Sequence, residues 1–286
     1  MTHETSAPIG VFDSGIGGLS VLRHIKQTLP NESLSYVADS GFAPYGDKSA
    51  ALILERSIAV TEFLLSQQIK ALVIACNTAT AAAIAHLRLH YPELIIVGME
   101  PGLKPAALLS QTKTVGVLAT RSTLQSDKYQ RLRSQLSIET GVEFISQACV
   151  GLVDQIEKAD IDSEQIRILL KQYLTPLLDA NADTLVLGCT HYPLVADLIR
   201  ELIPELMLEP MTRHVTTSTA VQLVDTGQAV ALHLQRLLVQ RGLDIKTDVK
   251  PAFTAYASGN IQRLQQACIQ WLHIAHKDVR MAALNT

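Results

Sequence analysis

Ala71-Leu72-Val73-Ile74-Ala75-Cys76-Asn77-Thr78 is the stretch that decides the fold. Its apolar run is typical of a strand buried in a parallel sheet, and it ends in a thiol followed by two hydrogen-bonding side chains. Thr184-Leu185-Val186-Leu187-Gly188-Cys189-Thr190-His191 repeats the pattern. Earlier in each half comes a second matched pair, Ile9-Gly10-Val11-Phe12-Asp13-Ser14 and Val115-Gly116-Val117-Leu118-Ala119-Thr120. Two elements that recur in the same order predict two related halves.

Short β-rich runs alternate with segments of helical periodicity along the chain, which predicts an α/β fold with parallel sheets. We expect two pseudo-symmetric, doubly wound halves, residues 1–104 with 226–286 and residues 105–225. Ligands of such sheets bind beyond the carboxyl ends of the strands, so we expect the active site in the cleft between the halves. The predicted strands are Pro8–Phe12, Leu34–Ala38, Ala71–Ala75, Leu94–Val97, Thr114–Leu118, Glu143–Ile145, Thr184–Leu187 and Gln222–Val224, and the clearest helices are Leu19–Leu29, Ala51–Leu65, Ser163–Leu178 and Gln228–Leu238.

Composition excludes several classes of protein. With 286 residues, 48% of them hydrophobic and 18% charged, the chain is long and apolar enough to fold as a globular protein. A net charge of -3 without a basic patch argues against nucleic acid as the primary partner. No apolar run approaches the ~20 residues that span a bilayer, and Met1–Pro8 lacks the features of a signal peptide, so we expect a cytoplasmic protein.

The cysteines at the two strand ends are candidates for acid/base chemistry. A single buried cysteine is usually a small core residue, but Cys76 and Cys189 occupy equivalent places, each before a helix whose N-terminus favours thiolate. Cys149 and Cys268 lack this setting and are interpreted as structural. Paired thiols suit the inversion of a carbon centre, where one group removes a proton from one face and the other delivers a proton to the opposite face.

Two other interpretations of the cysteines stay open. A Cys-His nucleophile could be built from Cys189 and His191, but it leaves Cys76 without a role. A zinc site from Cys76, Cys189 and His191 lacks ligand pairs at metal spacing.

The loop Asp13-Ser14-Gly15-Ile16-Gly17-Gly18 is not a dinucleotide fingerprint, and Asp13 places negative charge where a pyrophosphate would bind. Ser14 and the loop N–H groups could still hold a small carboxylate. Several small donors surround the thiols and suit an amino acid, although each could equally be a helix cap: Asn77, Thr78, Thr120, Thr123 and Thr190.

Four segments resemble the signatures of glutamate racemases, in family order and spacing. They are Asp13–Gly18, Pro44-Tyr45-Gly46, Ala75-Cys76-Asn77-Thr78-Ala79 and Gly188-Cys189-Thr190-His191-Tyr192-Pro193. The family is similar to aspartate racemases, but the Cys-Thr-His-Tyr-Pro form and the Pro-Tyr-Gly turn favour the glutamate branch.

The resemblance implies interconversion of L- and D-glutamate without pyridoxal phosphate or another cofactor, supplying D-glutamate for peptidoglycan. It makes Cys76 and Cys189 the catalytic pair, with Asp13 assisting Cys76, and His191 with Glu157 assisting Cys189. The implied substrate-binding residues are Asp13, Ser14, Tyr45, Gly46, Asn77, Thr78, Thr120, Thr123, Thr190 and His191.

The chain departs from the family pattern in two places. Val150 replaces the proline that commonly follows the cysteine in Cys149–Val153, the segment through which Glu157 is assigned. The stretch Glu209–Ala220 is longer and richer in threonine than expected, and is interpreted as a surface loop. Two further expectations come from the family: activation by a uridine-linked muramyl-alanine (UDP-muramyl-alanine) precursor, as in some bacterial members, and a homodimer, as in many.

Two alternative functions are kept. A racemase for aspartate or another amino acid would keep the thiols and change the side-chain pocket. A non-catalytic bilobal binding protein would bury the cysteines without using them.

Overall fold

The computed structural model describes residues 4–208, 220–246, 250–274 and 278–284. Contacts divide the chain into two compact units, residues 1–99 with 226–286 and residues 100–225. We call them the first and the second unit. The surface loop predicted at Glu209–Ala220 falls on residues 209–219, outside the described residues. None of the described helices is both long and apolar enough to cross a membrane.

The first unit is built on a parallel sheet. Within the described residues the sheet has six strands in the order β10-β9-β2-β1-β3-β4, and all its pairings are parallel. β1, β2 and β3 are buried along their whole length, as expected when helices cover both faces. The strands are β1 (Ile9–Asp13), β2 (Leu34–Ala38), β3 (Ala71–Ile74), β4 (Ile95–Gly98), β9 (Phe253–Ala257) and β10 (Val279–Met281).

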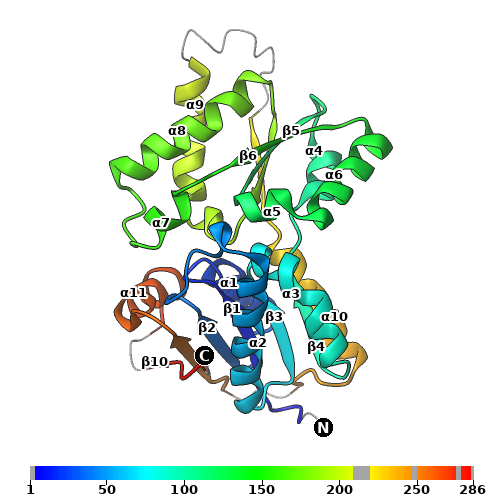
Figure 1. The fold of residues 1–286 in the computed structure, drawn as a ribbon, viewed down its shortest axis with the longest axis vertical. Helices are drawn as coiled ribbons and strands as arrows, with labels where there is room; N and C mark the ends of the chain where they lie inside the picture. Colours follow the sequence, from blue (N-terminus) through cyan, green and yellow to red (C-terminus); the bar gives the residue numbers. More distant parts are fainter. Residues whose placement is uncertain (1–3, 209–219, 247–249, 275–277, 285–286) are drawn as a thin grey trace. The chain divides into compact units, whose positions relative to one another are not determined.

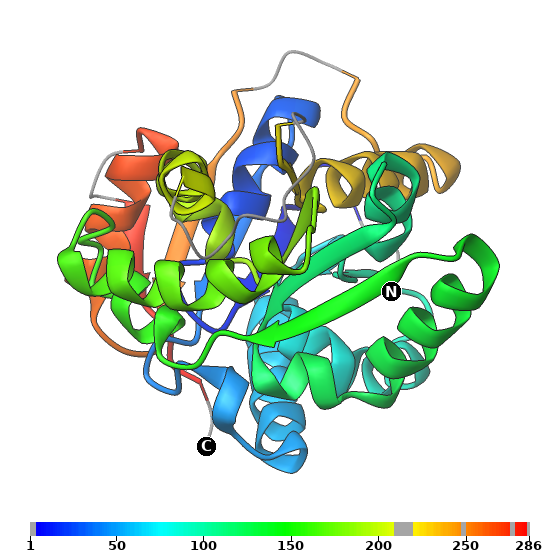
Figure 2. The same ribbon diagram turned by 90° about the horizontal axis from the view of Figure 1, so that it is seen from above.

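Helices of the first unit pack in two groups. α2 packs against α3, and α1 packs against α10 and α11. The C-terminal segment returns to the first strands, so that orange and red elements lie beside blue ones (Figures 1 and 2). The helices are α1 (Leu19–Thr28), the short 3-10 helix η1 (Tyr45–Asp47), α2 (Ala50–Ser66), α3 (Asn77–His90), α10 (Gly227–Gln240) and α11 (Ile261–Leu272).

The second unit has a parallel sheet of its own. In the described part of the chain its order is β6-β5-β7-β8, with parallel pairings throughout. α8 packs against α9, and α4 packs against α6. The elements are α4 (Leu103–Leu109), β5 (Thr114–Ala119), α5 (Arg121–Gln125), α6 (Asp127–Thr140), β6 (Glu143–Ala148), α7 (Leu152–Ile156), α8 (Glu164–Asp179), β7 (Thr184–Gly188), the 3-10 helix η2 (Tyr192–Val195), α9 (Ala196–Leu208) and β8 (Gln222–Val224).

The two sheets share one topology. β2-β1-β3-β4 in the first unit has the same order of connections as β6-β5-β7-β8 in the second. Glycines at equivalent positions of β1 and β5 allow a helix to pack closely on each sheet. A Cβ on Gly10 would lie 3.3 Å from Leu64 of α2, and one on Gly116 would lie 2.9 Å from Leu177 of α8. In each unit, therefore, a missing side chain lets the helix before the cysteine-bearing strand pack closely on the sheet.

The prediction of two parallel-sheet α/β halves is confirmed, and so are all eight predicted strands, with end shifts of a residue or a few. The sequence interpretation missed β9 and β10, which extend the first sheet beyond β2. β9 pairs with β2 from the opposite end of the chain, and β10 pairs in turn with β9. Local periodicity does not show which strand lies beside another.

Candidate active site

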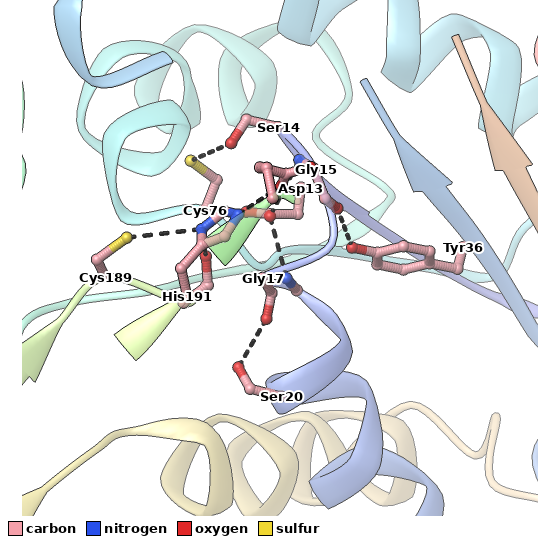
Figure 3. Close-up of polar contacts among 12 residues, drawn as sticks. Asp13, Ser14, Gly15, Gly17, Ser20, Tyr36, Cys76, Cys189 and His191 are labelled. Atoms are coloured by element: carbon pink, nitrogen blue, oxygen red, sulfur yellow. Dashed lines mark hydrogen bonds and ion pairs between the residues drawn. The ribbon is translucent and has the colours of Figure 1, made fainter. Parts of the chain in front are cut away.

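Cys76 lies where β3 ends and α3 begins. It is the N-cap residue of α3, its sulfur accepts a hydrogen bond from the backbone N–H of Ala79 at 3.4 Å, and its side chain is 6% exposed. The thiol donates towards Ser14 Oγ at 3.9 Å (Figure 3). The N-terminus of a helix favours negative charge, so this place suits the acid/base role that the sequence predicts for the thiol. The capping position expected for Asn77 or Thr78 is thus occupied by the cysteine itself.

Asp13 ends β1 and is fully buried. Its Oδ2 accepts hydrogen bonds from the backbone N–H groups of Gly15 at 3.2 Å and Gly18 at 3.0 Å. Tyr36 donates to the carbonyl of Gly15 at 2.6 Å, which fixes the same loop (Figure 3). Asp13 thus already uses the N–H groups of Gly15 and Gly18, two of the loop donors that the sequence offered to a substrate carboxylate.

Other substrate-binding candidates of the first unit lie around Cys76. Tyr45 and Gly46 are buried in η1 after a cis Ala43–Pro44 bond, and Asn77 and Thr78 are buried in the first turn of α3. Tyr45 belongs to the same core cluster as Cys76. The structure thus gathers Asp13, Ser14, Tyr45, Gly46, Cys76, Asn77 and Thr78 near the carboxyl ends of β1, β2 and β3.

Cys189 follows β7 in the second unit and is 7% exposed. Its sulfur lies 3.7 Å from His191 Nδ1, and His191 Nε2 lies 2.6 Å from Glu157 Oε1 (Figure 3 shows the first contact). An imidazolium in this place would donate from one nitrogen to the sulfur and from the other to the carboxylate. Neither side chain lies at the surface, because His191 is 1% and Glu157 7% exposed.

The pKa of His191 is raised well above its usual 6.5. Burial is the largest single influence and acts to lower the pKa, but the hydrogen bonds and charges of Cys189 and Glu157 together outweigh it. The folded protein therefore holds this proton more tightly than the unfolded chain does.

We expect His191 to make the unfolding free energy depend on pH. Because its pKa is raised in the folded state, its stabilising contribution is complete below about pH 6.5 and is lost as pH rises through the folded-state pKa. Denaturant unfolding of the wild type and His191→Asn at several pH values checks this, with the largest difference expected in acid. Glu157→Gln should flatten the wild-type profile, and a gap that widens with rising pH would contradict the assignment.

Three threonines of the second unit are predicted substrate-binding residues, and the structure shows where each one lies. Thr120 is the N-cap of α5 and accepts from the N–H of Thr123 at 3.3 Å, while its hydroxyl donates to Thr123 Oγ1 at 3.0 Å. Capping therefore holds for Thr120. The register pairs Ala119 with Gly188, so Thr120 and Cys189 follow neighbouring positions of adjacent strands. Thr190 is 3% exposed, and its Oγ1 lies 3.5 Å from His191 Nδ1.

The remaining cysteines are buried. All four cysteines lie in the described part of the chain and are free thiols. Burial raises the pKa of Cys268 to about 12, and burial is also the main cause of a raised pKa at Cys149. These thiols therefore stay protonated near neutral pH, in agreement with the structural role assigned to them.

Sequence reasoning missed a buried ion pair beside the first-unit candidates. Asp39 follows β2 and binds Arg56 of α2 through two hydrogen bonds of 3.0 Å. The position of Asp39 directly after a predicted strand was an available signal. No such signal exists for Arg56, which lies in the middle of an apolar helix.

These observations describe an α/β protein in which each unit carries a cysteine, with polar partners, at an equivalent strand end. Residues 9–234 match the family described as Asp/Glu/Hydantoin racemase. The chain belongs to this racemase family.

Several relatives of the chain are glutamate racemases, as the sequence motifs predicted. The chain is 51% identical over 263 residues to the glutamate racemase of Ectopseudomonas mendocina, covering 92% of this chain and 94% of that one. It is 50% identical over 238 residues to the glutamate racemase of Pseudomonas aeruginosa strain PAO1, covering 83% and 84%.

Solved glutamate racemases also have this fold. The enzyme of Francisella tularensis in complex with D-glutamate superposes with a TM-score of 0.80 at 28% identity, over 98% of this chain and 99% of that one. The Escherichia coli enzyme in complex with L-glutamate and the activator UDP-MurNAc-ala gives a TM-score of 0.78 at 29% identity, over 98% and 99%.

Proposed function

We propose that this protein interconverts L- and D-glutamate without a cofactor, with Cys76 and Cys189 as the two acid/base residues. The observation that carries the proposal is the pair of cysteines at the ends of the equivalent strands β3 and β7, in a chain 51% identical to a glutamate racemase. Relatives solved with D-glutamate and with L-glutamate support the choice of substrate.

The proposed reaction is a proton exchange at one carbon. One cysteine, as thiolate, takes the α-proton, and the electron pair left on carbon takes a proton from the thiol of the other cysteine on the opposite face. The first residue ends as thiol and the second as thiolate, so atoms and charge balance. Small donors at the helix starts would bind the α-carboxylate and stabilise the negative charge that develops there.

The two thiols have different helpers in this proposal. Cys76 has a backbone N–H donor and Ser14, with Asp13 held in the adjoining loop. Cys189 has His191, and His191 is oriented by Glu157. A histidine fixed by a carboxylate can exchange a proton with a neighbouring thiol, which suits the cycling of Cys189 between thiol and thiolate.

We extend the proposal to the biological role of the family. The product would be D-glutamate for peptidoglycan, made in the cytoplasm. UDP-MurNAc-Ala, the activator bound to the Escherichia coli enzyme, is the candidate activator of this chain, and a homodimer is the candidate assembly.

The test is exchange of the α-proton in heavy water. Purified protein without added cofactor should place deuterium at Cα of both enantiomers of glutamate, and circular dichroism should show each enantiomer approaching the racemate. Parallel assays with both enantiomers of aspartate decide the substrate, and an arm with UDP-MurNAc-Ala tests activation. Cys268→Ala, a change at a buried cysteine outside the proposed site, serves as the control and should racemise glutamate at the wild-type rate.

Each result has one meaning. Faster turnover of aspartate than of glutamate would mean that aspartate is the substrate. Substrate recovered without deuterium would make the protein a binder and end the proposal.

A further inference from the structure

Asp39 is the centre of a buried hydrogen-bond cluster at the carboxyl end of β2. It is fully buried and accepts four hydrogen bonds from three side chains. Oδ2 accepts from Tyr45 Oη at 2.6 Å and Arg56 Nε at 3.0 Å, and Oδ1 accepts from Arg56 Nη2 at 3.0 Å and Ser258 Oγ at 2.6 Å. We call these four residues the Asp39 clamp.

The clamp uses the full capacity of the carboxylate. Two carboxylate oxygens offer about four acceptor positions, and donors of the protein occupy all of them. Arg56 supplies the compensating charge in a bidentate pair, and its guanidinium lies 3.8 Å from the centre of the Phe42 ring. A carboxylate saturated in this way holds its neighbours in place and has no acceptor position left for a substrate proton.

Ser258 brings the C-terminal segment into the clamp. It follows β9, donates to Asp39, and accepts from the backbone N–H of Gly41 at 3.1 Å. The two loops pack backbone against backbone: a Cβ on Gly259 would lie 2.7 Å from the Gly41 nitrogen, and one on Gly41 would lie 3.0 Å from the Ser258 carbonyl oxygen. The glycines permit the approach that places Ser258 on Asp39.

Tyr45 connects the clamp to the candidate site. Its side chain is 1% exposed and packs in the core cluster that contains Cys76. Burial, followed by the charge of Asp39, raises its pKa, and the charge of Cys76 acts in the same direction. The hydroxyl therefore keeps its proton and directs it to Asp39, which fixes the ring and the neighbouring Gly46 in η1.

We propose that Asp39, Arg56 and Ser258 are positioning residues that hold Tyr45 and the η1 segment in the conformation that binds substrate next to Cys76. This inference rests on the proposed function, because the effect it predicts is on glutamate binding. It gives the C-terminal strand β9 a part in the site, through Ser258.

The test compares Ser258→Ala and Arg56→Lys with the wild type in the steady-state racemisation of glutamate. Ser258→Ala removes one hydrogen bond to a charged group, and Arg56→Lys removes the bidentate geometry. Each should raise KM about tenfold, the effect of one charge-assisted hydrogen bond, with kcat per folded molecule changed less than KM. A purely structural role would lower the amount of folded enzyme and leave KM unchanged.

Lys70 provides the matched control. Its side chain forms a buried ion pair with Glu32 and donates to the carbonyl of Leu243 at 2.8 Å. Lys70 directly precedes β3, so it lies at the opposite end of that strand from Cys76. Lys70→Arg disturbs a buried pair of the same unit and should lower stability without changing KM. A rise in KM for Lys70→Arg equal to that for Arg56→Lys would overturn the inference.

A double-mutant cycle tests whether the effect acts through Tyr45. The increase in KM caused by Ser258→Ala should be smaller in a Tyr45→Phe background, because the hydrogen bond from Tyr45 to Asp39 is already lost there. Wild-type KM values in both single variants, or full additivity in the cycle, would overturn the inference. A wild type that does not turn over glutamate would instead overturn the proposed function.

Discussion

Cys76→Ser should strongly slow racemisation of glutamate and leave slow α-proton exchange from one enantiomer only. Serine has nearly the size of cysteine, but its hydroxyl is far too weak an acid to work as a base near pH 7. General acid/base groups contribute about 10²- to 10⁴-fold, so kcat/KM should fall within or beyond that range. In the variant Cys189 still removes the proton from its own face and returns a deuteron there.

Cys189→Ser should give the opposite preference. Each variant keeps the thiol of one face, so the two should label opposite enantiomers when each is incubated in heavy water. Mass spectrometry of separated L- and D-glutamate measures this directly, with Cys268→Ala as the control for loss of a buried thiol. Labelling of the same enantiomer by both serine variants would contradict opposed bases, and full racemisation by either would remove that cysteine from the mechanism.

The positions of Cys76 and Cys189 at strand ends could be predicted from the sequence, because the residues that indicate them are their immediate neighbours. An apolar strand followed by a cysteine and hydrogen-bonding residues marks the carboxyl end of a parallel strand, and its recurrence at Cys189 separates it from ordinary core packing. The same reasoning located β3 and β7 to within a residue.

The Asp39 clamp could not be predicted in the same way. Arg56 lies on a helix whose pattern shows only apolar periodicity, and its pairing with Asp39 follows from the packing of α2. Ser258 reaches Asp39 because β9 pairs with β2, with Phe253 opposite Leu34. Contacts between residues so distant in sequence depend on the whole fold.

Glu157 illustrates a third case. Its neighbours Asp154, Gln155 and Lys158 give the segment the composition of an exposed helix end, and only the family resemblance assigned Glu157 a role. In the structure it is buried against His191, which belongs to the loop after β7. Burial of this charge is a tertiary effect, since the partner that compensates it comes from another element.

His191→Asn should slow racemisation about 10²-fold or more, because it removes the group that we propose exchanges protons with Cys189. The two enantiomers have the same free energy, so kcat/KM must fall equally for L- and D-glutamate in any variant. The difference between the two sides appears instead in exchange: α-proton removal by Cys189 should slow strongly and removal by Cys76 should stay nearly unchanged. Initial rates of deuterium incorporation from each enantiomer measure the two separately.

Glu157→Gln separates orientation from charge on the same side. In the wild type the Glu157 carboxylate lies 2.6 Å from His191 Nε2. The amide of the variant can still contact this nitrogen, but it lacks the charge that helps to keep the imidazole protonated. We expect activity between those of the wild type and His191→Asn, with the limb of the pH profile that belongs to His191 moved to lower pH. The direction follows because the carboxylate raises the pKa of His191, and its removal must lower it. A profile that stays in place would mean that Glu157 orients the ring without tuning its proton affinity, and an equal loss of exchange from both enantiomers would place His191 outside the Cys189 step.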